Sequence, residues 1–447
     1  MDHLKPAYHL RPGKNWINDP NAPVFWKDRY HMFFQHNPNE PVWGDIHWGH
    51  AESRDLVHWT VLPDAIAPGP EEYDKKGIYS GGAAVKDDIL HLFYTAAEPQ
   101  AQCLAVSRPD GTFEKHPRNP LIPEPPDGYD TPDFRDPFLW KDRDRYNMIL
   151  ASGYGGRGII FLYTSLDLLE WKYRGELYSE KLPAGVPALE CPLYFRLRGR
   201  DYLVFSPFDR SRYLCGRIAG NRFEAQTSGI LDQNSGWYAA NTLETVDGRR
   251  VLIAWLREER DVGSQKRAGW SGCLSLPREC TAGGDGRLLV KPLAELTSLR
   301  SAPVSVPETV LNRRATDLGL IPAGAELDLH MRMSMESGFE IRLFEDESRQ
   351  TGFIIRYGSR RIRLEDRLDS PYGKVPAKEE HCVPGSGEMR IRVFIDGSVI
   401  EVFVDERIAL SSRLYPGSGM SRYASVRKTG DGETVCTGTV YEMLPSM

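Results

Sequence analysis

The amino-acid sequence predicts an all-β protein in which a five-bladed β-propeller is followed by a C-terminal β-sandwich. Three observations support this prediction. A strand–turn–strand unit recurs about every 50 residues through roughly the first 290 positions. The 41 glycines and 32 prolines exceed the roughly 31 and 22 that average usage gives, as expected for a chain with many turns. After about residue 301 the unit disappears, but the alternation of apolar and polar residues typical of strands continues.

The recurring unit begins with a short signature and continues as a hairpin. Asp19-Pro20 is followed by NAPVFWKDRYHMFFQ, Asp136-Pro137 by FLWKDRDRYNMILAS, and Cys191-Pro192 by LYFRLRGRDYLVFSP. Each copy is an apolar strand, a charged turn and a second strand with alternating large apolar residues, which is the pattern of a β-hairpin. Looser copies begin at Ser80-Gly81 and Tyr238-Ala239.

The spacing of these units predicts a propeller. They begin at residues 19, 81, 136, 190 and 238, so successive starts are 48 to 62 residues apart. That spacing, with about four strands in each unit, is typical of propeller blades, whereas 50 residues are too few for a separate core in each unit. The first strand of each blade lines the central channel of a propeller. We therefore expect Asp19, Asp136 and Glu190 to cluster at one mouth of the channel.

The chain divides into two predicted domains joined by a linker. We assign residues 1–292 to the propeller, 293–303 to a linker with a short helix, and 304–447 to the sandwich. The helix is expected because leucines recur at every third position from 293 to 299. The clearest hairpin of the sandwich is 390–404, where Asp396-Gly397 is a strong tight-turn signal.

Charge and hydropathy argue against several classes of function. The 56 basic and 62 acidic residues give a net charge of −6, which provides no basis for binding nucleic acid or an acidic membrane. No run of 18 apolar residues could span a membrane. The seven cysteines are scattered, without a CxxC pair or zinc spacing. Together with the lack of an apolar export segment near the N-terminus, they favour a cytoplasmic location.

Three carboxylates are the candidates for chemistry. A single acidic residue in a β-protein is usually a turn former or a solvated charge. Glu190 lies between a leucine and a cysteine, and Asp136 lies between apolar residues beside Arg135. The sequence pattern predicts that both neighbourhoods are buried, and a buried carboxylate is costly unless it is paired or functional. Aromatic residues expected nearby suit a sugar site: Trp16, Trp43, Trp48, Tyr79 and Trp270.

A set of ordered motifs extends over nearly the whole chain. They are Trp16-Ile-Asn-Asp19-Pro-Asn21, Gln35-His-Asn-Pro38, WGHAESRDLVHW at 48–59, Phe134-Arg-Asp136-Pro and Glu190-Cys191-Pro. WSGCLSLPR at 270–278 and the hairpin at 390–404 follow in the same order. Together these motifs resemble glycoside hydrolase family 32, the family of invertases, β-fructofuranosidases and fructan hydrolases.

The resemblance implies a retaining β-fructofuranosidase that needs no metal or organic cofactor. By it, Asp19 is the nucleophile, Glu190 the general acid/base, and Asp136 the carboxylate that binds fructose hydroxyls and stabilises the transition state. The implied substrates are terminal β-D-fructofuranosides such as sucrose and short fructo-oligosaccharides, cleaved through a covalent fructosyl-enzyme intermediate. The implied sugar-binding residues are Asn18, Gln35, Trp43, Tyr79, Ser80, Arg135 and Trp270.

The sequence does not determine which sugar is the leaving group or which acceptor resolves the intermediate. Four departures from the common family pattern are expected at the pocket rim: Ile17, Ala22, Gly82 and Leu189. The alternatives to a hydrolase are a fructosyltransferase, in which a sugar resolves the intermediate, a remotely related inverting furanosidase, and a non-catalytic carbohydrate-binding protein. Sucrose, raffinose, inulin, levan and a phosphorylated sucrose are all candidate substrates. Monomer and homo-oligomer are both open.

Overall fold

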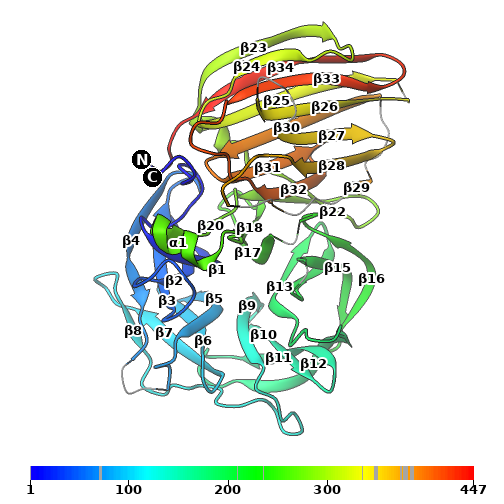
Figure 1. Ribbon diagram of the computed structural model, residues 1–447. Coiled ribbons are helices and arrows are strands. Elements are labelled where there is room, and N and C mark those ends of the chain that lie inside the picture. The colour runs from blue at the N-terminus through cyan, green and yellow to red at the C-terminus, as the bar shows by residue number, and fades with distance from the viewer. Residues whose placement is uncertain are drawn as a thin grey trace.

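The computed structural model describes residues 2–69, 73–208, 210–234, 236–334, 336–346, 351–372, 375, 381–382 and 387–447. The sheets divide into five that form a propeller and two that form a sandwich, which confirms the predicted fold class (Figure 1). The helices in the described residues are short: α1 (Val262–Ala268) and a 3₁₀-helix at Ala294–Leu299. None of them is long and apolar enough to cross a membrane.

The five blades follow one another along the chain. The first contains β1 (Asn15–Trp26), β2 (Arg29–Asn37), β3 (His47–Ser53) and β4 (Trp59–Ile66), and the second β5 (Ile78–Lys86), β6 (Ile89–Ala96), β7 (Ala101–Ser107) and β8 (Phe113–Lys115). The third contains β9 (Phe134–Asp142), β10 (Arg145–Tyr154), β11 (Arg157–Ser165) and β12 (Lys172–Lys181), and the fourth β13 (Glu190–Leu197), β14 (Arg200–Ser206), β15 (Arg212–Ala219) and β16 (Arg222–Ile230). The fifth contains β17 (Trp237–Glu244), β18 (Arg250–Leu256), β20 (Cys273–Leu274), β21 (Arg278–Ala282) and β22 (Leu288–Pro292).

The first strands of the blades form the inner ring of the propeller. β1, β5, β9, β13 and β17 each contact the next in this order, and β17 contacts β1. The ring is also closed by β19 (Trp270–Ser271), which pairs in parallel with the start of β1. The recurring unit in the sequence therefore corresponds to the blade, and each predicted start falls within the first five residues of an inner strand.

Each inner strand carries a β-bulge near its start. The pairing register shifts between Ile17 and Pro20 in β1, between Tyr79 and Gly81 in β5, and between Glu190 and Leu193 in β13. The corresponding shifts in β9 and β17 lie at Asp136 and Ala239, both of which have a positive φ. A bulge leaves a residue out of the ladder and re-aims its side chain, so each blade can present a polar group at the same mouth of the channel.

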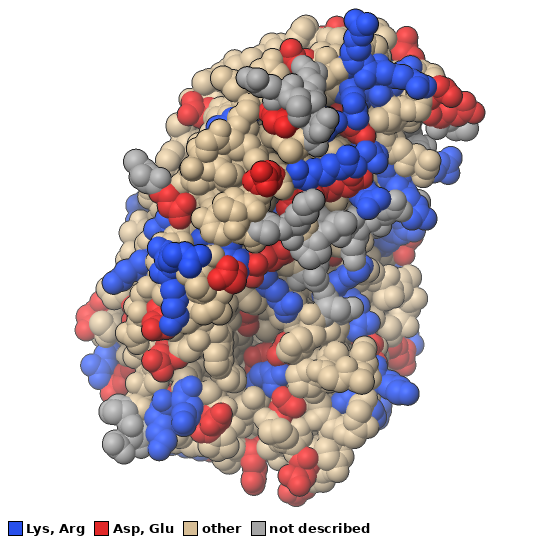
Figure 2. Space-filling view, in the orientation of Figure 1, with Lys and Arg blue, Asp and Glu red and all other residues tan. Residues whose placement is uncertain are grey.

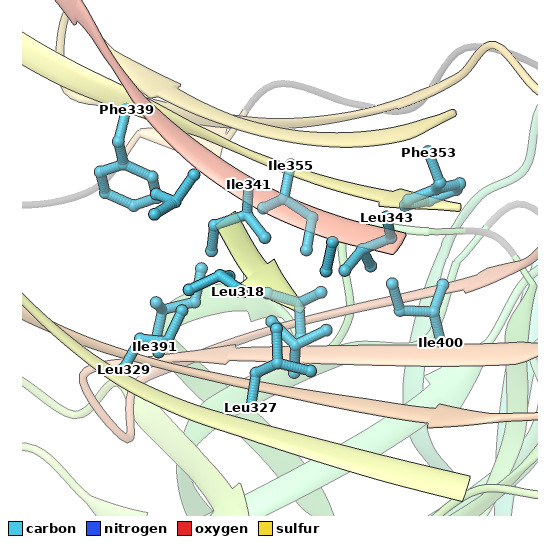
Figure 3. Packing of buried hydrophobic residues seen from close by; sticks show 14 of the residues in the cluster. Leu318, Leu327, Leu329, Phe339, Ile341, Leu343, Phe353, Ile355, Ile391 and Ile400 are labelled. Carbon is cyan, nitrogen blue, oxygen red and sulfur yellow. The ribbon is translucent and has the colours of Figure 1, made fainter. Parts of the chain in front are cut away.

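The sandwich consists of two six-stranded sheets. One is ordered β23 (Arg300–Val310), β34 (Thr434–Met443), β25 (Gly324–Met333), β30 (Glu388–Asp396), β31 (Val399–Val404) and β32 (Ile408–Arg413). The other is ordered β24 (Thr316–Leu320), β33 (Tyr423–Gly430), β26 (Ser337–Glu345), β27 (Phe353–Gly358), β28 (Arg361–Asp366) and β29 (His381–Cys382). Figure 3 shows the apolar core between them, in which Leu327 and Ile391 face Ile341 and Ile355. β23 begins at Arg300, inside the segment predicted as linker.

Buried ion pairs join the sandwich to the propeller. Glu401 of β31 accepts hydrogen bonds from Arg278 of β21 and contacts Nε2 of His9 at 3.2 Å. Nδ1 of His9 lies 2.8 Å from Asp396, and the Arg278 guanidinium also lies 2.9 Å from Asp232. Because both ring nitrogens of His9 face carboxylates, both must carry a proton. The buried charges therefore lock the relative position of the two domains.

We expect this contact to make stability depend on pH. Burial lowers the pKa of His9, but the hydrogen bonds to Asp396 and Glu401 outweigh burial and raise the pKa above 6.5. The contact therefore stabilises the fold fully below about pH 6.5 and is lost as the pH rises through the folded-state pKa. His9→Gln should lower the free energy of unfolding by about 1.5–3 kcal/mol at about pH 6, and by less at about pH 9.

Denaturant unfolding of the wild type and of His9→Gln across this pH range measures the difference in their free energies of unfolding. His58→Gln is the matched control, because His58 also pairs with an aspartate, Asp55, but its side chain is 51% exposed. An exposed pair contributes little, so we expect the control to change stability by less than about 1 kcal/mol throughout. A difference between wild type and His9→Gln that is constant with pH would contradict the assignment of a protonated His9.

Candidate active site

A cavity of about 640 Å³ opens at one mouth of the propeller channel. Figure 2 shows a hollow in the propeller face below the sandwich, with acidic and basic side chains inside it. The inner strands of all five blades contribute to its lining: Asp19 from β1, Ser80 from β5, Asp136 from β9, Glu190 from β13 and Tyr238 from β17. The predicted convergence of Asp19, Asp136 and Glu190 is therefore confirmed.

Most of the sugar-binding residues implied by the family resemblance also line the cavity. They are Asn18, Gln35, Trp43, Tyr79, Ser80 and Arg135. Trp16, which was expected only as a nearby aromatic residue, lines it as well. The remaining lining residues have no counterpart in the prediction: Gln100, Asp133, Cys191, Phe208, Tyr238, Trp255 and Arg257.

Asp19 is held by uncharged donors. Asn18 Nδ2 donates to its Oδ1 at 3.1 Å, Ser80 Oγ donates to its Oδ2 at 2.7 Å, and Cys191 Sγ lies 3.7 Å from Oδ2. Gln35 orients both donors, since its amide accepts from Asn18 and donates to Ser80 Oγ at 2.6 Å. Burial raises the pKa of Asp19, and the hydrogen bonds from Ser80 and Asn18 oppose this increase.

Asp136 is the most enclosed of the three carboxylates. Its Oδ2 accepts from the backbone N–H of Cys191 at 2.9 Å and lies 3.9 Å from Arg135 Nε. Burial raises the pKa of Asp136 to about 7; Arg135 opposes this increase and Glu190 adds to it. A proton therefore resides easily on this group of carboxylates near neutral pH.

Glu190 lies between a cation and a phenol. Arg135 Nη2 donates to its Oε1 at 2.9 Å, and the Tyr238 hydroxyl hydrogen-bonds to its Oε2. With a side chain 19% exposed, Glu190 is accessible from the cavity, although the sequence pattern suggested burial. The Tyr238 hydroxyl also lies 2.7 Å from the carbonyl of Ser206. A phenol has one proton to donate, so Tyr238 can serve Glu190 when it is ionised and Ser206 when Glu190 is protonated.

Tyr238 could have been found from the sequence. Tyr238-Ala239 is the start of the fifth copy of the repeat, and Tyr238 lies at the first or second residue of its inner strand, as Glu190 does in the fourth blade and within one residue of the position of Asp136 in the third. Burial raises the pKa of Tyr238 and the charge of Glu190 raises it further, so the phenol keeps its proton. The position of a residue within its blade therefore indicates a functional role better than the chemical type of its side chain does.

Trp270 was wrongly predicted to bind the sugar. Its side chain is 1% exposed and does not line the cavity; its indole N–H donates to Asp2 at 2.6 Å, and the Arg260 guanidinium lies 4.2 Å from its ring centre. Trp48 is equally buried, with its indole N–H on the carbonyl of Tyr79 at 3.0 Å. Trp48 therefore supports Tyr79 of the cavity wall from behind, whereas Trp270 packs with Leu4 and Tyr415 away from the cavity.

The four departures from the family pattern do not lie at the rim, contrary to expectation. Ile17 and Leu189 are fully buried in the core, and Ala22 and Gly82 line a different cavity that is formed farther along the inner strands. The exposed aromatic residues of the site are instead Trp43 and Phe208, with 56% and 49% of their surface exposed. Among the described residues, no group of three or more His, Cys, Asp or Glu side chains is arranged to hold a metal ion.

Comparison with known proteins identifies the family. The models of the N-terminal and C-terminal domains of glycosyl hydrolases family 32 match residues 9–292 and 295–442. Sucrose-6-phosphate hydrolase of Escherichia coli is 34% identical, over 92% of this chain and 89% of that protein. Raffinose invertase of Escherichia coli is 32% identical, over 95% and 92%. The solved structure of fructan 1-exohydrolase IIa from Cichorium intybus superposes with a TM-score of 0.90 at 23% identity, covering 100% of this chain and 98% of that one. The chain therefore belongs to glycoside hydrolase family 32.

Proposed function

We propose that the cavity hydrolyses terminal β-D-fructofuranosides with retention of configuration, as in a β-fructofuranosidase of the invertase type. The observation that carries this proposal is the meeting of Asp19, Asp136 and Glu190, from three different blades, in one cavity of sugar size. Two of these carboxylates are needed to break a glycosidic bond, one to protonate the leaving oxygen and one to stabilise or trap the oxocarbenium-like transition state. The curated relatives, which include sucrose-6-phosphate hydrolases and an invertase, support the same activity.

Asp19 is the nucleophile because its surroundings leave it free to react. Its partners Asn18, Ser80 and Cys191 are uncharged, and none of them neutralises the carboxylate as an ion pair would. Attack of a carboxylate oxygen on C2 of the fructosyl group forms an ester bond as the bond from C2 to the leaving oxygen breaks. Removal from water also makes the negative charge of Asp19 less stable in the free enzyme than in the transition state.

Glu190 is the general acid/base because it has partners suited to both protonation states. It first gives its proton to the leaving oxygen, and the resulting carboxylate accepts hydrogen bonds from Arg135 and Tyr238. It then takes a proton from the water that attacks C2 and releases fructose from Asp19. Asp136, enclosed beside Arg135, accepts hydrogen bonds from fructose hydroxyls and adds negative charge near the oxocarbenium-like carbon.

A substrate panel read by chromatography tests the activity. With sucrose, raffinose, inulin and levan, each at low and high concentration, a hydrolase releases fructose from a terminal position and forms glucose and fructose from sucrose in equal amounts. Glucose in large excess over free fructose would instead show that a sugar resolves the intermediate, as in a fructosyltransferase. Binding of sucrose without release of fructose would contradict catalysis altogether.

We also propose that the enzyme acts in the cytoplasm. The described part of the chain contains six free thiols. Cys191 lies in the cavity, and Cys103 is fully buried. Free thiols persist in a reducing compartment. Fractionation of cells that express the full chain, with fructoside hydrolysis assayed in each fraction, tests this location; activity outside the cytoplasm would contradict it.

A further inference from the structure

The edge strand β32 of the sandwich lies against the fifth blade of the propeller. It is the last strand of its sheet, on the side that faces the propeller (Figure 1), and it contacts β22. Its final residue, Arg413, is buried. The guanidinium donates from Nη2 to the carbonyl of Leu256 at 2.6 Å and from Nε to the carbonyl of Arg257 at 2.9 Å. The chain leaves β18 for the cavity wall at these two carbonyls, so a sandwich residue fixes the backbone at that point.

A second side chain of the sandwich holds the same segment. The Tyr415 hydroxyl accepts a hydrogen bond from the backbone N–H of Glu259 at 3.1 Å and donates to Oε1 of Glu258 at 2.5 Å. Burial raises the pKa of Glu258, but the charges of Arg413 and Arg260 outweigh burial and lower this pKa to about 2. Glu258 therefore carries a negative charge that balances the buried charge of Arg413, and the guanidinium can stay ionised at the domain boundary.

The same strand also supports the segment that leads into β17. The backbone N–H of Ser411 donates to Oδ1 of Asp232 at 3.0 Å, and the Ser411 hydroxyl donates to Oδ2 at 2.8 Å. The side-chain amide of Asn234 donates in turn to the carbonyl of Ser411. β17 begins shortly after Asn234 and carries Tyr238, the phenol beside Glu190. The sandwich therefore supports both segments that form the cavity wall on the side of the acid/base.

The two supported segments meet beside Glu190. The Arg257 guanidinium lies 3.7 Å from the ring centre of Tyr238, whose hydroxyl hydrogen-bonds to Oε2 of Glu190. Nη1 of Arg257 also donates to the carbonyl of Phe208 at 3.4 Å, and the backbone N–H of Phe208 donates to the Tyr238 hydroxyl at 3.0 Å. Burial and the charge of Glu190 raise the pKa of Tyr238, and the charge of Arg257 opposes this increase. Arg257 therefore makes the phenol a stronger donor to the carboxylate that Glu190 becomes when its proton leaves.

We propose that Arg413 is a positioning residue for the acid/base. By fixing the backbone of Arg257, it holds the Arg257 guanidinium on the ring of Tyr238 and keeps the phenol where it stabilises Glu190 as the proton leaves. The inference rests on the proposed function, in which Glu190 protonates the leaving oxygen. It gives the sandwich a part in catalysis, although none of the described residues that line the cavity comes from the sandwich.

Two substrates separate this role from a general effect on folding. Sucrose needs a proton on its leaving oxygen and a fructosyl fluoride does not, and kcat/KM of each reports the steps up to the first bond cleavage. We expect Arg413→Gln to lower kcat/KM by about 10-fold to 100-fold on sucrose, and by less than about threefold on the fluoride. Loss of folded protein would instead lower both values equally.

A milder variant and a control accompany Arg413→Gln. Tyr415→Phe removes one hydroxyl from the same support, so it should lower the sucrose-to-fluoride ratio of kcat/KM by about twofold to fivefold. This variant decides the test if Arg413→Gln does not fold. His9→Gln is the matched control, because it breaks another buried contact between the domains, with Asp396 and Glu401, and should leave the ratio unchanged.

A double-mutant cycle tests whether Arg413 acts through Arg257. Arg257→Gln alone should lower the sucrose-to-fluoride ratio at least as much as Arg413→Gln, and the double variant should lower it no further than Arg257→Gln does. Additive losses would overturn the proposal, because Arg413 would then act by another route. An unchanged ratio in Tyr415→Phe, or a lowered ratio in His9→Gln, would overturn it too. Failure of the wild type to hydrolyse any β-fructoside would instead refute the proposed function.

Discussion

Asp19→Ala should abolish hydrolysis of every β-fructoside, with kcat at least about 10⁴-fold below that of the wild type. The loss is large because no other carboxylate can take the place of Asp19: Asp136 is enclosed by Arg135 and the backbone of Cys191, and Glu190 must supply the proton. Progress curves for fructose release with a concentrated enzyme preparation measure the residual rate. Residual turnover within about tenfold of the wild type would reassign the nucleophile.

Stability measurements distinguish this catalytic loss from misfolding. The raised pKa of Asp19 means that the folded state disfavours its charge, so removal of the carboxylate should leave the thermal midpoint unchanged or raise it at neutral pH. Asp285→Ala is the matched control, since Asp285 forms an exposed pair with Arg287 and does not line the cavity, so this change should alter neither activity nor midpoint.

Glu190→Gln should lower turnover of sucrose by about 10²-fold to 10⁴-fold while leaving substrate binding largely intact. Glutamine keeps the shape of the side chain and can still contact Arg135 and Tyr238, but it has no proton to give. A fructosyl fluoride needs no protonation of its leaving group, so its first step should be far less affected. Burst kinetics with this substrate measure that step separately, and Glu224→Gln, an exposed glutamate paired with Arg217, is the control.

The second step provides an independent check of Glu190. Without a general base, the fructosyl-enzyme should accumulate in Glu190→Gln, and azide, which needs no base, should release it as fructosyl azide. Equal losses on sucrose and on the fluoride, with no effect of azide, would contradict the assignment of Glu190 as acid/base.

The fold and the three carboxylates were predictable because the chain repeats. A blade is a local unit, so its hairpins and turns leave a pattern in the sequence, and the ring geometry then brings equivalent positions together. Asp19, Asp136 and Glu190 sit in copies of the same signature, which is why residues more than 50 positions apart could be placed at one mouth.

What could not be predicted depends on contacts between segments that share no pattern. Trp270 carries a family motif, but whether its ring faces the cavity or Asp2 depends on how the N-terminal segment packs. Arg257 looks like any charged residue after a strand, and only the fold shows that it stacks on Tyr238 without an ion-pair partner in the described part of the chain. The sequence therefore indicated the three carboxylates better than the side chains that form the rest of the cavity wall.

The stereochemistry of the first product tests the central claim most directly. Proton and carbon NMR spectra of sucrose hydrolysis, recorded in the first minutes with enough enzyme to outrun mutarotation, distinguish the anomers of released fructose. Two displacements at C2, first by Asp19 and then by water, retain the configuration, so β-fructofuranose should appear first and equilibrate later. First appearance of α-fructofuranose would mean a single displacement by water and would contradict a covalent intermediate on Asp19.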